Sequence, residues 1–143
     1  MEYSSTKPIH ILVGTFNLNG QTNGIKEDLS SWLCPNVGAS QQQPEIVAVG
    51  FQEIVELSPQ QIMSTDPARR QMWEKAVRRT LNENAAKAGS EEYVLLRSGQ
   101  LVGAALAIFV RSSVLRDIKN VEGSVKKVSS SVRTIVISAN FFP

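Results

Sequence analysis

Polar side chains follow two apolar runs of this sequence, at the point where each run ends. The run in "HILVGTFNLNG" ends at Asn17 and Asn19, and the run "IVAV" at 46–49 leads into "GFQEIVEL", which contains Gln52 and Glu53. Mg²⁺ prefers oxygen ligands and usually takes one or two protein carboxylates, keeping waters and substrate phosphate oxygens for the rest of its shell. We therefore predict that Glu53 ligates Mg²⁺ and that Asn17 orients this shell or contacts the substrate. Such a metal would polarise a phosphoryl oxygen and help the leaving oxygen to depart.

The same residues also have a purely structural interpretation. Glu53 would then emerge into solvent at a strand end, and Asn17 would cap a turn. An asparagine and a glutamate separated by one helix-sized segment are a weak signal, so the spacing leaves both interpretations open.

Two strands and a helix are predicted to position these side chains. Residues 9–17 and 45–52 are rich in Ile, Val, Thr and Phe and are predicted strands, and residues 25–33 have apolar side chains at helical spacing. A right-handed crossover makes the two strands parallel. Their carboxyl ends then lie at the same sheet edge, which brings Asn17 close to Glu53.

A long helix is predicted at 67–87. Asp66 and Pro67 form an N-terminal signature, and Gly89 provides the stop. One stripe of the helix is expected to be buried, and its basic residues are expected to form a solvated face, with contact to a membrane surface as the alternative. The stripe comprises Met72, Trp73, Ala76, Val77 and Leu81, and the basic residues are Arg69, Arg70, Lys75, Arg78, Arg79 and Lys87.

The second half of the chain is predicted to form locally paired strands. Residues 93–97 and 101–111 are expected to form a hairpin closed by "SGQ" at 98–100, and 120–128 and 132–139 are two further strands. Local pairing beside one early βαβ crossover predicts a mixed sheet with helices, an α+β fold.

The composition sets broad limits. The chain has 143 residues, 42% of them hydrophobic, which suits one domain or part of a larger one. The net charge of +2 is too small to indicate a nucleic-acid partner. The single cysteine, Cys34, excludes an intramolecular disulfide and fits a reducing, cytoplasmic location. Neither a signal peptide nor a transmembrane segment is expected.

Several longer stretches resemble a known family. "GTFNLNG" followed by "FQE" is similar to the first two signature segments of the magnesium-dependent endonuclease/exonuclease/phosphatase superfamily. "VGFQEIVELSPQQI", "YVLLRSGQLVGAAL", "IFVR" and "IKNVEGSVKK" resemble the inositol polyphosphate 5-phosphatases, the synaptojanin-like branch in particular. The resemblance covers roughly residues 10–127, in the family's order.

The resemblance implies a partial four-layer α/β/β/α sandwich and Mg²⁺-dependent removal of the 5-phosphate of phosphatidylinositol 4,5-bisphosphate. Glu53 matches the family's magnesium-binding glutamate, and Asn17 matches its active-site asparagine. Asn19 and Gln52 lie in the same motifs and are assigned to the supporting shell. The implied partner is a phosphoinositide, with peripheral contact to a membrane surface.

The sequence departs from the family after residue 127. The tail "VSSSVRTIVISANFFP" at 128–143 replaces the glycine-rich segment, and the Gly-Asp-Leu-Asn, Trp-Cys-Asp-Arg and Ser-Asp-His stretches are missing. We therefore expect residues 1–127 to be the N-terminal part of the catalytic domain and 128–143 to be a divergent tail, in which "RTIVISA" could pair as an edge strand. The only histidine, His10, is predicted at the end of the first strand away from Asn17, so it is not the water-activating base. Lys126 and Lys127 are expected to be an exposed strand end rather than phosphate ligands.

An incomplete sandwich leaves apolar faces uncovered. We expect Val13, Val47, Val49, Leu106 and Phe109 to lack partners, and the chain to be marginally stable or to bind a protein partner that covers its core. The favoured function is a 5-phosphatase segment that is inactive alone. The alternatives are a non-catalytic module that binds a membrane or a partner chain, and a metal-dependent nuclease, which the "FQEIVEL" and "SGQLVG" matches disfavour.

Overall fold

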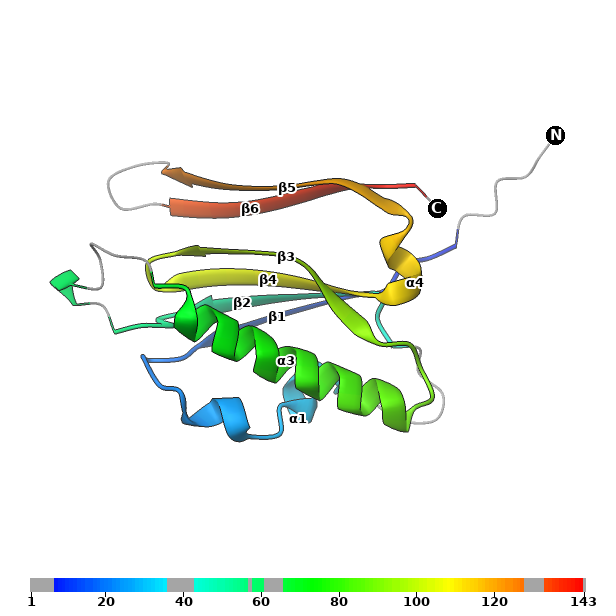
Figure 1. Cartoon of the computed structure of the whole chain (residues 1–143), viewed down its shortest axis with the longest axis horizontal. Coiled ribbons are helices and arrows are strands. Elements are labelled where there is room, and N and C mark those ends of the chain that lie inside the picture. The colour runs from blue at the N-terminus through cyan, green and yellow to red at the C-terminus, as the bar shows by residue number, and fades with distance from the viewer. Residues whose placement is uncertain (1–6, 36–42, 57, 61–65, 128–132, 143) are drawn as a thin grey trace.

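Three layers stack in the structure, which is a computed structural model that describes residues 7–35, 43–56, 58–60, 66–127 and 133–142. A helical layer covers one face of a four-stranded sheet, and a two-stranded sheet lies on the other face (Figure 1). This α/β/β stack is a partial form of the expected α/β/β/α sandwich, and it confirms the α+β prediction. In the described residues no helix is long and apolar enough to cross a membrane.

The four-stranded sheet contains the predicted crossover. Its strands are ordered β1-β2-β4-β3, with β1 at Ile11–Asn17, β2 at Ile46–Gln52, β3 at Tyr93–Leu101 and β4 at Ala104–Arg111. β1 and β2 are parallel, and their register pairs Asn17 with Gln52 at the carboxyl ends. β2–β4 and β3–β4 are antiparallel, so the sheet is mixed, as predicted.

The helix predicted at 25–33 is divided into two short pieces. A 3₁₀ turn, η1, spans Asn23–Lys26, and α1 spans Ser30–Leu33. Asp28 explains the break, since its Oδ1 accepts hydrogen bonds from the Ser30 amide at 2.9 Å and from the Ser30 hydroxyl. Such a local side-chain bond competes with continued helix and starts a new one. The same two bonds lower the pKa of Asp28.

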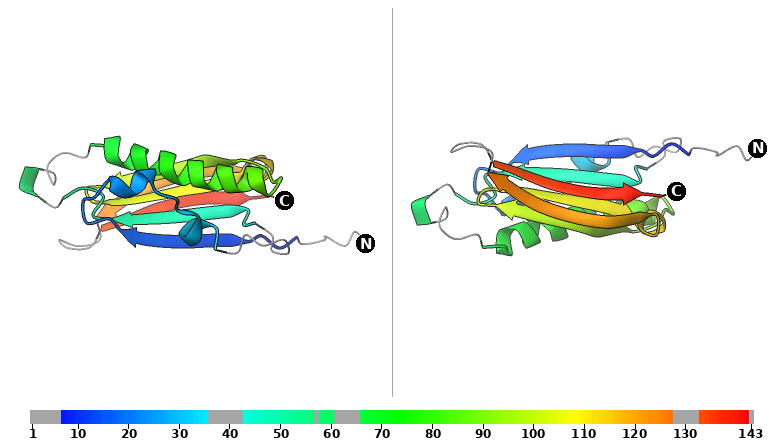
Figure 2. Two further views of the ribbon diagram at one scale, coloured as in Figure 1. Left: turned by 90° about the horizontal axis from the view of Figure 1, so that it is seen from below. Right: turned by 90° about the horizontal axis from the view of Figure 1, so that it is seen from above.

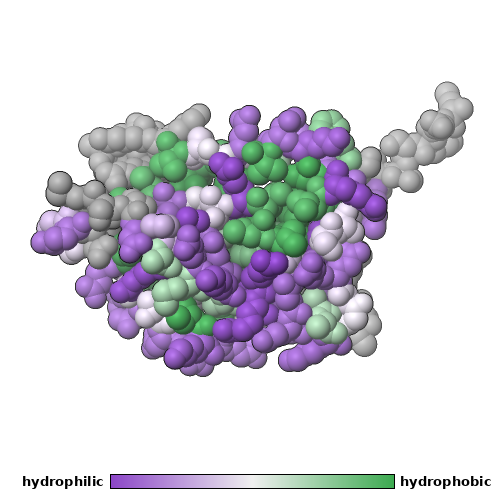
Figure 3. Space-filling model, in the orientation of Figure 1, coloured by the Kyte–Doolittle hydropathy of each residue, from purple (hydrophilic) through white to green (hydrophobic). Residues whose placement is uncertain are grey.

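The long helix α3 spans Ala68–Lys87 and begins and ends as predicted. Asp66 Oδ1 accepts a hydrogen bond from the Ala68 amide at 2.9 Å, Pro67 already has helical dihedral angles, and Gly89 follows the helix with a φ of 64°. A hydrophilic surface covers most of the outward side of α3 (Figure 3).

The buried stripe of α3 differs from the prediction at Met72, which is 40% exposed. Trp73, Ala76, Val77 and Leu81 are buried, as expected. The buried face of α3 also includes two polar residues, Glu74 and Asn84, whose hydrogen bonds permit their burial. Glu74 pairs with Arg70 at 2.7 Å, and Asn84 donates to Ser30 Oγ at 2.8 Å. Four of the six basic residues are exposed as predicted, namely Lys75, Arg78, Arg79 and Lys87. Arg69 and Arg70 are half-buried, so the solvated-face prediction is wrong for these two.

The turn predicted at 98–100 is wrong, because β3 continues to Leu101 and the chain reverses at Val102 and Gly103. Leu101 pairs with Ala104, and Val102 takes a positive φ of 51°. Gly99 has another use: a Cβ added there would lie 3.1 Å from Ile135 of the second sheet. The glycine therefore permits close approach of the two sheets rather than a turn.

The second sheet is an antiparallel pair of β5 at Ile118–Lys127 and β6 at Arg133–Phe141, which follows the short helix α4 at Ser112–Leu115. The strand predictions here are confirmed, including the pairing of the "RTIVISA" run, although residues 128 and 132 lie outside the described part. β5 and β6 contact β3. Seen from above, they leave β1 uncovered (Figure 2).

The main core lies between the helices and the four-stranded sheet. Val47, Val49 and Phe109 are fully buried there, so the prediction that they lack partners is wrong. Alternate residues of a strand point to opposite faces, and the helices cover the face that carries these three. On the other face Val13 is 75% exposed and Ile11 59% exposed, as an incomplete sandwich predicts.

Candidate metal site

Asn17 and Glu53, which lie 36 positions apart in the sequence, meet at the carboxyl ends of β1 and β2. Asn17 Nδ2 donates a hydrogen bond to Glu53 Oε1 at 2.9 Å. The predicted proximity is therefore confirmed, and it follows from the parallel register that pairs Asn17 with Gln52.

The orientation of the Asn17 amide is fixed by its neighbour. The backbone amide of Asn19 donates to Asn17 Oδ1 at 2.9 Å, so the amide oxygen faces Asn19 and the amide nitrogen faces Glu53. Among the described residues, the Glu53 carboxylate has this one hydrogen bond, which engages Oε1. The other oxygen, Oε2, remains available to a cation.

Glu53 has an uncommon backbone conformation, with a φ of 49°. Three hydrogen bonds hold it: Gly20 N–H donates to Glu53 O at 2.7 Å, Leu18 N–H donates to Gln52 O at 2.9 Å, and Ile54 N–H donates to Gly103 O at 2.9 Å. Leu18 and Ile54 are buried, which anchors both loops in the core. Such a conformation persists only where the surroundings over-determine it, and it clusters at functional sites.

Gln52 is held by a residue that the sequence did not indicate. Its Nε2 lies 2.6 Å from Thr15 Oγ1, on the same side of the sheet as Asn17. The signal was present, because Thr15 precedes Asn17 by two positions and therefore shares its face. Asn17, Asn19 and Gln52 are exposed and Glu53 is half-buried, so the site is open to solvent.

The residues at this edge fit a magnesium ion. The described residues contain no group of three His, Cys, Asp or Glu side chains that could enclose a metal. They do provide one carboxylate with a free oxygen, oriented by a neighbouring amide. That set suits a cation that keeps several waters and takes substrate oxygens.

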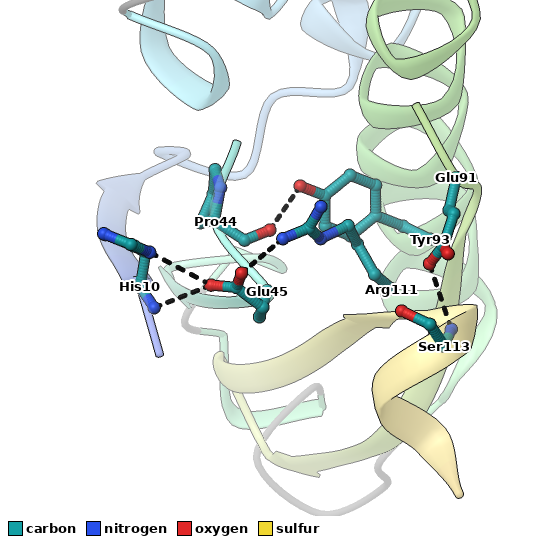
Figure 4. Close-up of polar contacts among 7 residues, drawn as sticks. All are labelled: His10, Pro44, Glu45, Glu91, Tyr93, Arg111 and Ser113. Carbon is teal, nitrogen blue, oxygen red and sulfur yellow. Dashed lines mark hydrogen bonds and ion pairs between the residues drawn. The ribbon is translucent and has the colours of Figure 1, made fainter. Parts of the chain in front are cut away.

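His10 lies at the opposite end of the sheet, as predicted, where it is exposed at the rim of a polar cluster around the buried Glu45 (Figure 4). Glu45 Oε2 accepts a hydrogen bond from the His10 backbone amide at 2.7 Å and lies 3.3 Å from His10 Nδ1. Arg111 Nη2 pairs with Glu45 Oε1, and the Tyr93 hydroxyl donates to Pro44 O at 2.6 Å. No local sequence pattern predicts this cluster, since its members come from segments far apart in the sequence.

The cluster shifts two pKa values. Burial acts to raise the pKa of Glu45, but the hydrogen bonds from His10 and the charge of Arg111 outweigh it, so the pKa is lowered from 4.5. Burial raises the pKa of Tyr93 to about 12. The cluster is therefore a charged structural unit that joins β1, β2 and β4, remote from Glu53.

Comparisons with known proteins agree with the geometry. A profile described as Endonuclease/Exonuclease/phosphatase family 2 matches residues 14–136. The chain is 49% identical over 126 residues to inositol-1,4,5-trisphosphate 5-phosphatase 1 of Schizosaccharomyces pombe and 35% identical over 127 residues to phosphatidylinositol 4,5-bisphosphate 5-phosphatase INP51 of Saccharomyces cerevisiae. Each match covers 88% of this chain, but only 11% and 13% of the respective relatives.

Among solved structures, the chain is similar to the inositol polyphosphate 5-phosphatase domain of SPsynaptojanin, crystallised in complex with inositol (1,4)-bisphosphate and a calcium ion. The TM-score is 0.76 and the sequence identity is 42%. The match covers 93% of this chain and 36% of that one, so the chain spans about a third of the solved domain.

Proposed function

This chain belongs to endonuclease/exonuclease/phosphatase family 2, and on that premise we propose that it carries part of the active site of a Mg²⁺-dependent phosphoinositide 5-phosphatase. The substrate class is proposed from the relatives, whose names describe enzymes that act on inositol phosphates and phosphatidylinositol 4,5-bisphosphate. A divalent ion is supported by the calcium in the similar solved domain, and Mg²⁺ by the oxygen ligands at the strand ends.

One observation carries the proposal: the amide of Asn17 holds Glu53 Oε1 and leaves Oε2 open at an exposed strand end. Glu53 would hold the ion, and Asn17 would keep the carboxylate in one rotamer. When bound, Mg²⁺ would supply Lewis-acid stabilisation of charge on a phosphoryl oxygen. Gln52, fixed by Thr15, presents an amide beside this position and is assigned to substrate orientation.

The chain's one histidine, His10, is not at this edge, and the described residues contain no group of three His, Cys, Asp or Glu side chains that could hold a metal. Activation of water needs a base within hydrogen-bonding reach, and His10 is at the opposite end of the sheet. We therefore propose that the chain by itself binds Mg²⁺ but hydrolyses phosphoinositide slowly or not at all. We also propose a reducing, cytoplasmic location with peripheral access to membrane lipids, which fits a chain whose single cysteine, Cys34, cannot form an intramolecular disulfide.

The first test is Mg²⁺ binding, followed by NMR shifts of the Asn17 side-chain amide. The wild type is expected to bind saturably and Glu53→Gln to lose binding, whereas Glu83→Gln, an exposed glutamate on α3, should bind as the wild type does. Equal binding by the wild type and Glu53→Gln would contradict the proposed site.

The second test is phosphate release from short-chain phosphatidylinositol 4,5-bisphosphate, with Mg²⁺ and then with chelator. The chain is assayed alone and mixed with the remaining part of the 5-phosphatase domain of the S. pombe relative. We expect release only from the mixture, dependent on Mg²⁺ and abolished by Glu53→Gln. Cleavage of duplex DNA in a parallel assay, without phosphate release from the lipid, would favour the nuclease alternative.

A second function is favoured by the uncovered face of β1. Val13 and Ile11 are 75% and 59% exposed there, on the face that also carries Thr15 and Asn17. A module that binds a protein chain through this face would need neither Mg²⁺ nor Glu53. If the chain still binds a protein partner after Glu53→Gln and after a chelator has removed Mg²⁺, that result would support the binding module over the phosphatase.

A further inference from the structure

Arg69, in the first turn of α3, does not extend into solvent. Its side chain is half-buried, and its Nη1 donates a hydrogen bond to the backbone carbonyl of Gly20. Gly20 lies 49 positions earlier, in the loop that follows β1. A cation in the long helix therefore contacts the backbone of the loop that borders the candidate metal site.

Gly20 connects Arg69 to Glu53. Its carbonyl accepts from Arg69, and its amide donates to Glu53 O at 2.7 Å. Its position leaves no room for a side chain, because φ is 68° and a Cβ would lie 2.7 Å from Glu56 Cγ. Gly20 thus links the helix to the backbone of the predicted metal ligand through two hydrogen bonds.

The same loop also fixes Asn17. Asn19, directly before Gly20, donates its backbone amide to Asn17 Oδ1 at 2.9 Å. Both Asn19 and Gly20 have positive φ angles, of 46° and 68°. Gln21 N–H donates to Leu18 O at 2.8 Å, which closes a turn with Asn19 and Gly20 at its centre, a pair that readily takes positive φ angles. The Arg69 hydrogen bond attaches this turn to a regular helix.

Further contacts place the loop along the helix and so fix the position of Arg69. The ring of Trp73 lies against Gly24, where a Cβ would be 2.9 Å from Cη2. Arg79 Nη2 donates to Ile25 O at 2.8 Å and Glu27 O at 3.3 Å. Segment 20–27 therefore runs beside α3 with several attachments, and Arg69 is the attachment nearest to Glu53.

We propose that Arg69 is a positioning residue for Glu53, acting through the two peptide groups that flank Gly20 rather than by touching metal or substrate. The proposal rests on the proposed function only for the identity of Glu53 as the metal ligand. The hydrogen-bonded path from Arg69 through Gly20 to Glu53 does not depend on it.

Position and charge predict opposite effects of removing Arg69. A nearby positive charge repels Mg²⁺, so a purely electrostatic role predicts tighter Mg²⁺ binding when the charge is removed. A positioning role predicts weaker binding, because loss of an outer-shell partner typically lowers metal affinity about 10–100-fold. The sign of the change in affinity separates the two.

The test compares Arg69→Met, Arg69→Lys and the control Arg78→Met. Arg78 is exposed on the same helix and has no polar partner among the described residues. Amide hydrogen exchange of Asn19 and Gly20 is measured without metal, and Mg²⁺ affinity is measured by NMR titration. Thermal unfolding of each variant checks that it folds. If Arg69→Met does not fold, Arg69→Lys, which keeps a positive charge and a hydrogen-bond donor, is used for both measurements.

Arg69→Met is expected to exchange the Gly20 amide at least about tenfold faster and to bind Mg²⁺ about 10–100-fold more weakly. Arg69→Lys should restore part of both, and Arg78→Met should change neither. Unchanged exchange at Gly20, or tighter Mg²⁺ binding by Arg69→Met, would overturn the proposal. If wild type and Glu53→Gln bind Mg²⁺ alike, the metal assignment fails separately, and the exchange rates still decide whether Arg69 fixes the loop.

Discussion

The side-chain amide of Asn17 donates a 2.9 Å hydrogen bond to the carboxylate of Glu53, across 36 positions of sequence. Because Asn19 fixes the other end of that amide, Asn17 behaves as a clamp on one carboxylate oxygen. The clamp sits on an exposed surface, where a hydrogen bond contributes little to folding. Its consequences are therefore expected in metal binding rather than in stability.

Asn17→Ala tests this separation. We expect Mg²⁺ affinity to fall about 10–100-fold, because Glu53 is no longer held in one rotamer. The free energy of unfolding should change by less than about 1 kcal/mol, since Asn17 is exposed. Mg²⁺ titration and urea unfolding measure the two quantities, with the exposed Asn140→Ala on β6 as the control. A large loss of stability with unchanged affinity would make Asn17 a structural turn residue.

A side chain added at Gly14 is expected to press against Trp32. A Cβ at Gly14 would lie 3.0 Å from the ring of Trp32, which packs against Phe16 and Phe51. Gly14→Val should therefore lower the free energy of unfolding by about 1–3 kcal/mol, as overpacking does. Gly50→Ala on the neighbouring strand is the control, because its nearest contact would be 3.8 Å. Equal unfolding midpoints for the two variants would show that Trp32 moves freely.

A valine-to-threonine substitution should lower the free energy of unfolding more on the helix-covered face of the four-stranded sheet than on its other face. Val49 is fully buried on the face that the helices cover, whereas Val13 is 75% exposed on the other face. Val49→Thr should lower the free energy of unfolding by about 1–3 kcal/mol, because it buries a hydroxyl without a hydrogen-bond partner. Val13→Thr should cost less than about 0.5 kcal/mol and should reduce self-association at high concentration. Sedimentation and urea unfolding would check both, and a costly Val13→Thr would mean that this face is covered in solution.

Acid should destabilise the fold through Glu45. Its pKa is lowered in the folded state by the bonds from His10 and the charge of Arg111, although burial opposes them. A lowered pKa contributes stability that is present above the unfolded value of 4.5 and is lost as pH falls through the folded value. We therefore expect unfolding free energy to decline below about pH 4.5.

Glu45→Gln identifies this contribution. At neutral pH the variant should lose up to about 3 kcal/mol, because Arg111 is left without its carboxylate. Its stability should then vary less with pH than that of the wild type in the acid range. Parallel pH profiles for the two proteins would assign the acid sensitivity to other carboxylates.

Much of the candidate site followed from sequence periodicity. Two apolar strand patterns joined by one crossover predicted that Asn17 and Glu53 share a sheet edge, and the register confirms it. Parallel pairing needs only the strand ends and the handedness of the connection. The start of α3 also followed from local chemistry, because Asp66 and Pro67 act within one turn.

The failures share a physical cause. The predicted burial of Met72 and the predicted exposure of Arg69 are wrong, because helical spacing indicates which residues share a face but not which elements pack against that face. The glycine in "SGQ" predicts a turn, because sequence alone does not distinguish a glycine that permits close approach of a second sheet from one that takes a positive φ. The Glu45–Arg111 pair and the Thr15–Gln52 bond join residues from different strands, which no local pattern specifies.

The strand pairing that creates the site also predicts when the site forms during folding. β3–β4 and β5–β6 are hairpins of neighbouring strands, whereas β1 and β2 pair across the whole crossover, and β2 and β4 pair across a longer stretch still. Loop closure over long separations is paid in chain entropy before contacts form, so such pairings are slow. The hairpins should therefore precede β1–β2 docking, and the environment of Glu53 should be among the last regions to become native.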